Sequence, residues 1–200
     1  IGISMYPNDG ADIGTLLKNA DIAMYRAKER GDCYEFYERK MEADVARRLG
    51  IESDLRGAIE RGEMMVFYQP QENLETNELI GMEALVRWEH PKRGMMNPLE
   101  FIGLAEETGQ ILELGQWVMK TACAQLKSWL DKGCPPIRMA VNLASRQLEN
   151  GSIVEQVGAT LIETGLPSQY LELEITESTI MANAEEVIVT LDRLKTMGVQ

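Results

Sequence analysis

Apolar and polar residues follow two different periods along the first 38 residues of the chain. Residues 1–5 and 34–37 are short, nearly continuous apolar runs that are typical of strands. Between them, residues 13–30 carry apolar side chains at the spacing of a helix, and Gly31 ends that pattern. Residues 1–38 therefore predict a strand-helix-strand unit, which needs further structure to bury its faces.

A charged segment follows this unit. Apolar residues recur near the helical period from 38 to 61, among many acidic and basic side chains, and Gly62 ends the pattern. We interpret residues 39–62 as a helix that connects two domains and has a solvated face.

The pattern then changes to that of a hairpin. Residues 64–70 and 79–88 are typical of strands, and a turn joins them. Helical spacing follows over 98–107 and 110–132, and Asn97 is a favourable capping residue for the first of these helices.

Strands and helices alternate along the last third of the chain. The pattern predicts strands at 137–143 and 170–176 and helices at 153–164 and 184–197. Such alternation with short loops indicates parallel βα units, which place functional residues at the carboxyl ends of their strands. We assign residues 63–200 to a second domain of the α/β class.

Charge and cysteine content exclude several classes of function. The 20 basic and 32 acidic residues give a formal net charge of −12, which argues against a nucleic-acid polymer as a partner because clustered Lys and Arg hold such polymers. The single histidine, His90, excludes any site that needs two imidazoles, so we expect oxygen atoms to hold any metal. The three cysteines form no CxxC pair, and the default expectation is a reducing, cytoplasmic setting.

The ends of the sequence suggest a window on a longer protein. The chain begins without Met inside an apolar run, and it stops at Gln200 just after a helical pattern. The sequence has neither an apolar run of membrane-spanning length nor the pattern of a signal peptide.

Polar side chains stand where covered parallel strands normally carry Val, Ile or Leu. These strand-end residues are Glu83, Arg87, Asn142, Glu172, Glu174 and Glu177. One explanation is a hard divalent cation such as Mg²⁺ or Mn²⁺, which takes carboxylate and amide oxygens and removes the repulsion between the acids. The other explanation is that these residues alternate onto a solvated face.

Five blocks of the sequence together resemble the EAL family of cyclic di-GMP phosphodiesterases. In order, they are YQP at 68–70, EALVRW at 83–88 with His90-Pro91, FIGLAEETG at 101–109, VNL at 141–143 and LELEITES at 171–178. The tripeptide EAL alone carries no weight, but five blocks in the family's order and spacing are specific.

A second resemblance covers the first unit. The runs IGISMYPNDG, LLKNADIAMYRAKERG and YEFY, which lie within residues 1–37, are similar to the C-terminal end of a GGDEF diguanylate cyclase domain. This resemblance implies that Lys28 lies near nucleotide phosphates.

The resemblance to the EAL family implies the first half of an EAL-type (β/α)₈ TIM barrel, preceded by the GGDEF remnant and the connecting helix. It implies that Glu83 and Glu174 are catalytic and that, with Asn142, they hold Mg²⁺ or Mn²⁺. Its other implied site residues are Gln69, Leu85 and Arg87 in the dinucleotide site, with Arg87 facing a phosphate, and Glu177 as a supporting carboxylate or a simple strand end.

The family pattern also implies features outside these 200 residues. It places further catalytic residues after Gln200, so we expect this piece alone to be inactive and the edge of its last strand to be unpaired. It also implies a homodimer through the EAL domain, an upstream sensory domain, and a cytoplasmic protein or one anchored to the inner membrane. The alternative is a catalytically degenerate module that binds cyclic di-GMP or a protein partner as a receptor.

Overall fold

The computed structural model describes residues 1–29, 31, 33–149, 151–176 and 184–200. The chain divides into two compact units, Ile1–Asp54 and Leu55–Gln200. Among the described residues, no helix combines the length and the apolar character needed to cross a membrane.

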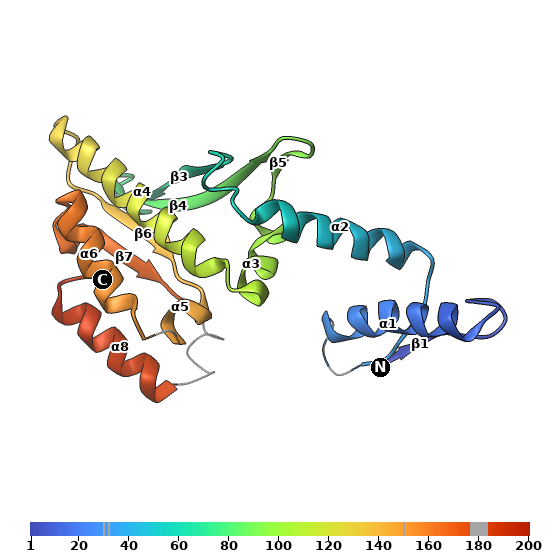
Figure 1. The fold of residues 1–200 in the computed structure, drawn as a ribbon. Helices are drawn as coiled ribbons and strands as arrows, with labels where there is room; N and C mark the ends of the chain where they lie inside the picture. The colour runs from blue at the N-terminus through green and yellow to red at the C-terminus, as the bar shows by residue number, and fades with distance from the viewer. Residues whose placement is uncertain (30, 32, 150, 177–183) are drawn as a thin grey trace. The chain divides into compact units, whose positions relative to one another are not determined.

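The first unit contains the predicted strand-helix-strand arrangement. Strands β1 (Gly2–Ile3) and β2 (Glu35–Phe36) pair in parallel, and helix α1 (Ile13–Glu29) lies between them in the sequence (Figure 1). A side chain at Gly2 is impossible here, because a Cβ atom would lie 1.9 Å from the carbonyl oxygen of Ala20. Glycine thus lets α1 pack directly against β1.

The predicted connecting helix is shorter than the sequence pattern indicates. Helix α2 covers Lys40–Leu55, and the residues that follow it form turns instead of continuing to 61. Gly57 adopts a φ of +76°, which a helix does not accept, and the Glu63 amide donates to the Ala58 carbonyl at 3.0 Å. The periodicity missed this end because charged residues continue on both sides of it.

The second unit is built on a five-stranded mixed sheet. Strands β3 (Met64–Glu72) and β4 (Leu79–His90) form the predicted antiparallel hairpin, while β6 (Arg138–Asn142) and β7 (Leu171–Glu174) extend the sheet in parallel (Figure 1). The short strand β5 (Gly94–Met96) pairs with β4 and was not predicted. The parallel βα arrangement expected after residue 137 is confirmed.

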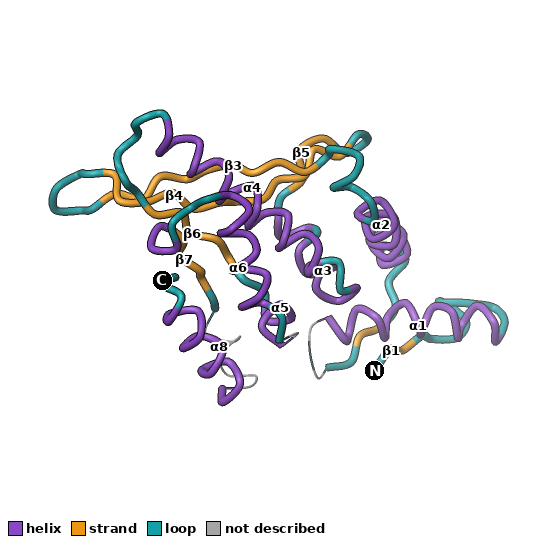
Figure 2. The backbone as a smooth tube through the Cα atoms, turned by 60° about the vertical axis from the view of Figure 1, so that its left-hand side comes forward, coloured by secondary structure: helices purple, strands orange, loops and turns teal. Residues whose placement is uncertain are grey.

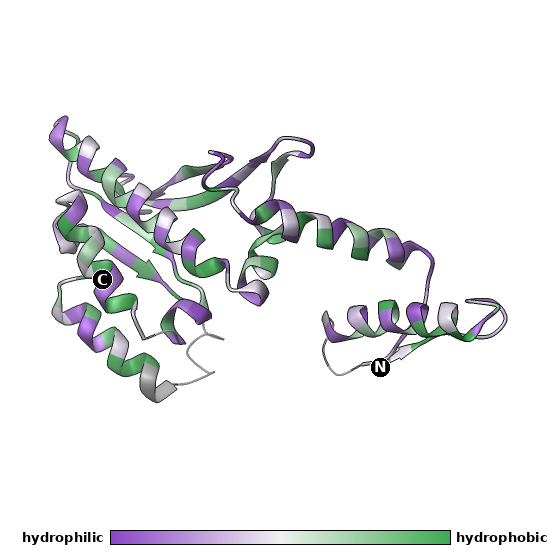
Figure 3. Cartoon of the chain, in the orientation of Figure 1, coloured by the Kyte–Doolittle hydropathy of each residue, from purple (hydrophilic) through white to green (hydrophobic). Residues whose placement is uncertain are grey.

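Helices connect the strands and cover the sheet. They are η1 (Pro98–Glu100), α3 (Ile102–Thr108), α4 (Ile111–Asp131), α5 (Ser145–Glu149), α6 (Ile153–Thr164), η2 (Ser168–Tyr170) and α8 (Ala184–Thr196). Figure 2 shows α4 and α6 along one side of the sheet. In Figure 3, hydrophobic and hydrophilic residues alternate in bands along α4, as expected for a helix with one buried face.

The hydrophobic core of the second unit lies between the sheet and these helices. Trp88 and Phe101 are fully buried and meet edge to face with their ring centroids 5.5 Å apart. His90 is 2% exposed and its Nδ1 accepts a hydrogen bond from the Lys92 amide at 3.0 Å, so it is a packing and turn residue. Asn97 caps η1 with its side chain, as predicted.

The outer edge of β7 is paired, contrary to the expectation from the sequence. The Gln200 amide donates to the Leu171 carbonyl at 3.0 Å, and the Leu173 amide donates to the Gln200 carbonyl at 2.8 Å. These two hydrogen bonds are those of a parallel bridge.

Candidate functional site

The register of the strands brings the predicted site residues onto one face of the sheet. Gln69 lies opposite Glu83 in the hairpin, and Asn142 lies beside Glu174 in the parallel pair. Ala84 and Trp88 occupy alternate positions of β4 and are buried on the opposite face, toward the helices. Alternation along β4 therefore directs Glu83, Leu85 and Arg87 away from the helices. We call this side the polar face.

Glu83 and Asn142 are in direct contact on the polar face. The Asn142 Nδ2 donates a hydrogen bond to the Glu83 Oε1 at 2.7 Å, although 59 residues separate the two in the sequence. Because the amide donates through its nitrogen, its Oδ1 remains available as a ligand. Strands β4 and β6 thus bring these two polar side chains together, with Glu83 in the interior of β4 and Asn142 at the end of β6.

The environment of Glu174 disfavours a negative charge on its carboxyl. Desolvation raises the pKa of its carboxyl, and the negative charges of Glu83 and Glu172 raise it further. A hydrogen bond of 3.4 Å from the Gln71 amide to Glu174 Oε1 opposes this rise. The charge of Glu83 thus disfavours the ionisation of Glu174, and a cation between the two would relieve this repulsion.

Gln71 was not among the predicted site residues. It lies on β3 two positions after Gln69, so both side chains are on the polar face. The period of two was the signal that could have identified it.

Arg87 is available to an anion. Its Nη1 donates to the Val86 carbonyl at 2.8 Å, and its guanidinium lies 5.5 Å from the centroid of the Phe67 ring. Among the residues that the structure describes, no carboxylate pairs with Arg87. Leu85 lies opposite Phe67 in the hairpin register and borders a mainly apolar cavity of about 420 Å³, which Asn142 also lines.

Glu172 is neutralised by an arginine. Its Oε2 forms an ion pair of 3.0 Å with Arg138, whose Nη1 also donates to the Gln200 side chain at 2.9 Å. A bound cation is thus not needed to explain the carboxylate of Glu172, because Arg138 on the neighbouring strand already compensates its charge.

Two further predictions concern Glu177 and Lys28. Glu177 lies outside the described residues. Lys28 is exposed in the last turn of α1, within the first unit.

The three remaining oxygen ligands fit a hard divalent cation by their chemistry. Glu83 and Glu174 offer carboxylates and Asn142 offers an amide oxygen, which are ligands that Mg²⁺ and Mn²⁺ accept. Within the described part of the chain, no group of three or more His, Cys, Asp or Glu side chains could hold a metal, so the amide is an essential member of the candidate set.

Comparison with known proteins identifies the family. The model of the EAL domain matches residues 52–200. The chain belongs to the EAL-domain family. This EAL-family chain is 42% identical over 200 residues to the bifunctional diguanylate cyclase/cyclic di-GMP phosphodiesterase MucR of Pseudomonas aeruginosa, and 35% identical over 201 residues to the cyclic di-GMP phosphodiesterase PdeR of Escherichia coli. All of the chain is covered in both comparisons, but it spans only 29% of MucR and 30% of PdeR.

Solved EAL structures have the same fold. The MucR phosphodiesterase in complex with c-di-GMP is 41% identical and has a TM-score of 0.73, covering 75% of this chain and 61% of that one. The EAL enzyme Bd1971 bound to cAMP and cyclic di-GMP is 25% identical and has a TM-score of 0.72, covering 94% of this chain and 50% of that one. The mixed α/β architecture described above is therefore that of an EAL domain.

Proposed function

We propose that this chain forms part of a phosphodiesterase that hydrolyses cyclic di-GMP to the linear dinucleotide. The observation that carries the proposal is the contact of Glu83 with Asn142, beside Glu174, on one face of an EAL-type sheet. The names of MucR and PdeR as cyclic di-GMP phosphodiesterases, and the c-di-GMP complex of MucR, support the same substrate.

In this proposal, Glu83, Asn142 and Glu174 hold Mg²⁺ or Mn²⁺. A divalent cation, when bound, lowers the pKa of a coordinated water and neutralises charge that develops on the phosphate. The hydrogen bond from Asn142 fixes the Glu83 carboxylate, and Gln71 holds Glu174 near it. These contacts support a prepared set of oxygen ligands.

Arg87, Gln69 and Leu85 bind the dinucleotide in this proposal. The planar guanidinium of Arg87 remains charged at every physiological pH and donates to phosphate oxygens in a fixed geometry. Its position over Phe67 supports this role, because the ring restricts the side chain without neutralising it. Gln69 lies directly opposite Glu83, next to the proposed cation.

The proposal extends to the architecture of the natural protein. It assigns residues 1–38 to a GGDEF remnant, 39–62 to a connecting helix and 63–200 to the first half of an EAL-type (β/α)₈ barrel. The diguanylate cyclase in the name of MucR supports a tandem arrangement. A homodimer through the EAL domain, an upstream sensory domain and a cytoplasmic setting complete this proposal.

Replacing Glu83 in the natural full-length protein tests the proposed site. We expect Glu83→Ala to remove one cation ligand and to reduce hydrolysis of cyclic di-GMP by at least about a hundredfold, with Mn²⁺ affinity falling in parallel. Glu89→Ala is the matched control, because Glu89 is an exposed glutamate on the same strand. Product formation is measured by chromatography, and Mn²⁺ binding by electron paramagnetic resonance.

The outcomes separate an enzyme from a receptor. Unchanged hydrolysis by Glu83→Ala would contradict the assignment of this ligand. Binding of cyclic di-GMP by the wild-type protein without any turnover would instead favour the receptor.

A further inference from the structure

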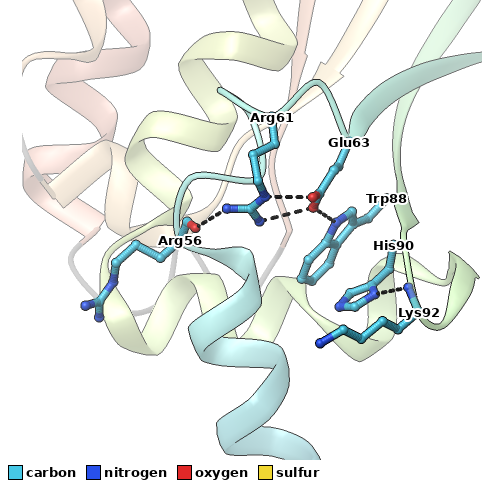
Figure 4. Close-up of polar contacts among 6 residues, drawn as sticks. All are labelled: Arg56, Arg61, Glu63, Trp88, His90 and Lys92. Atoms are coloured by element: carbon cyan, nitrogen blue, oxygen red, sulfur yellow. Dashed lines mark hydrogen bonds and ion pairs between the residues drawn. The ribbon is translucent and has the colours of Figure 1, made fainter.

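A partly buried carboxylate outside the polar face organises the start of the second unit. Glu63 lies immediately before β3, and only 13% of its side chain is exposed. The Arg61 guanidinium donates hydrogen bonds to both carboxylate oxygens of Glu63, from Nε to Oε1 at 2.6 Å and from Nη2 to Oε2 at 3.1 Å. Figure 4 shows this pair beside the indole of Trp88.

The Arg61 guanidinium has a second hydrogen-bond partner besides Glu63. Its Nη1 donates to the backbone carbonyl of Arg56 at 2.9 Å, while the Arg56 side chain points away from the cluster (Figure 4). The hydrogen bond from Arg61 keeps the pKa of Glu63 below its usual value, so the carboxylate is ionised at neutral pH. The two residues form a charged clamp with a defined geometry.

The clamp acts on β4 through Trp88. The Trp88 Nε1 donates to Glu63 Oε2 at 3.0 Å, and the indole is fully buried. An indole has one hydrogen-bond donor, so without Glu63 that donor would lose its partner. The backbone adds a second connection, since the Glu89 amide donates to the Glu63 carbonyl at 2.9 Å.

Trp88 and Arg87 are adjacent on β4 and point to opposite faces of the sheet. The clamp therefore fixes the peptide that carries Arg87 from the helix side, while Phe67 restricts the guanidinium on the polar face. A displacement of Trp88 that carries its backbone along rotates the same stretch of strand and moves Arg87 relative to Glu83.

We infer that Glu63 is a positioning residue for Arg87, which it holds in place through Trp88. The inference rests on the proposed function, in which Arg87 binds a phosphate of cyclic di-GMP. Glu63 itself lies on the helix side of the sheet and contacts no substrate.

A double-mutant cycle on the natural full-length protein tests this role. The dissociation constant for cyclic di-GMP is measured in EDTA, which prevents cation-dependent turnover, at a temperature at which circular dichroism shows every variant folded. We expect Glu63→Ala to weaken binding about tenfold, the order seen when one member of a shared network is lost. Arg56→Ala is the control and changes binding by less than about twofold, since only its backbone takes part.

The decisive comparison is the effect of Glu63→Ala on binding in a protein that already carries Arg87→Ala. If Glu63 acts through Arg87, the double variant Glu63→Ala, Arg87→Ala binds as Arg87→Ala does. A merely structural role predicts that the two losses multiply, and that result overturns the inference, as does an unchanged affinity of Glu63→Ala. Glu63→Gln retains an oxygen for the Trp88 donor and is expected to recover part of the affinity.

Two conservative variants cover a failure of Glu63→Ala to fold. Trp88→Phe removes the indole donor and also part of the buried ring, so Glu63→Gln is compared within that background, where it should have little additional effect. If Glu63→Gln weakens binding of cyclic di-GMP equally in the wild-type and the Trp88→Phe backgrounds, the inference is contradicted. A wild-type protein that binds no cyclic di-GMP instead contradicts the proposed function.

Discussion

Glu174 lies on the polar face in an environment that disfavours a negative charge on its carboxyl. Its raised pKa arises from desolvation and from Glu83 and Glu172 nearby, and Gln71 compensates only in part. In the proposed function, the same arrangement that disfavours the charge of Glu174 favours binding of a cation.

The sign of this shift predicts how Glu174→Gln affects stability. A carboxyl whose folded-state pKa is raised destabilises the fold when ionised, so its penalty is absent well below pH 4.5, the ordinary value, and is fully present above the raised pKa. We expect Glu174→Gln to raise the melting temperature in EDTA at pH 7 and to leave it unchanged at strongly acidic pH. A lower melting temperature at pH 7 would contradict this electrostatic account.

At the scale of elements, two glycines in neighbouring helices show how closely α4 is packed. A Cβ atom at Gly115 in α4 would lie 2.3 Å from Gln147 Nε2, and Gln147 is only 3% exposed. A Cβ atom at Gly103 in α3 meets no atom within 4 Å. The two positions differ in packing but share a helical backbone.

Alanine at these positions should have opposite effects. Gly103→Ala stabilises its helix by about 0.5–1 kcal/mol, because alanine loses less backbone entropy. Gly115→Ala is expected to destabilise the protein by about 1–3 kcal/mol, because the buried Gln147 has to move. Chemical denaturation of both variants measures the difference, and a stabilised Gly115→Ala would show that Gln147 yields freely.

The sequence predicted long elements well and short ones poorly. The helix at 153–164 matches α6 at both ends, since apolar spacing and Gly165 mark it clearly. Three residues of β5 and five of α5 are too few to show a period. The early end of α2 depends on the backbone of Gly57, which the periodicity of its neighbours does not reveal.

The polar face was predictable in its residue types but not in its pairings. The predicted strand ends identified Glu83, Asn142 and Glu174 among six polar residues, and the resemblance to the EAL family singled out these three as ligands. Neither could show that Arg138 neutralises Glu172 or that Gln71 contacts Glu174, because those contacts depend on the register between strands. The clamp of Arg61 and Glu63 and its hydrogen bond from Trp88 could likewise be recognised only from the three-dimensional structure.

At the scale of the whole molecule, the net charge of −12 is compatible with a small anionic substrate where bound cations or a local arginine offset the acidic side chains. In the proposed function, the carboxylates of the polar face collect divalent cations, and Arg87 then receives a phosphate. The chain spans under a third of the relatives named above, so this account concerns the natural protein that contains it.

The central claim is cation-dependent hydrolysis of cyclic di-GMP at the polar face. Its most direct test is the rate at which the natural full-length protein forms the linear dinucleotide, measured in Mg²⁺ or Mn²⁺ and in EDTA. The account predicts rapid formation of the linear product with the cation and none with the chelator. Equal rates in both conditions, or stable binding of intact cyclic di-GMP in the presence of the cation, would contradict it.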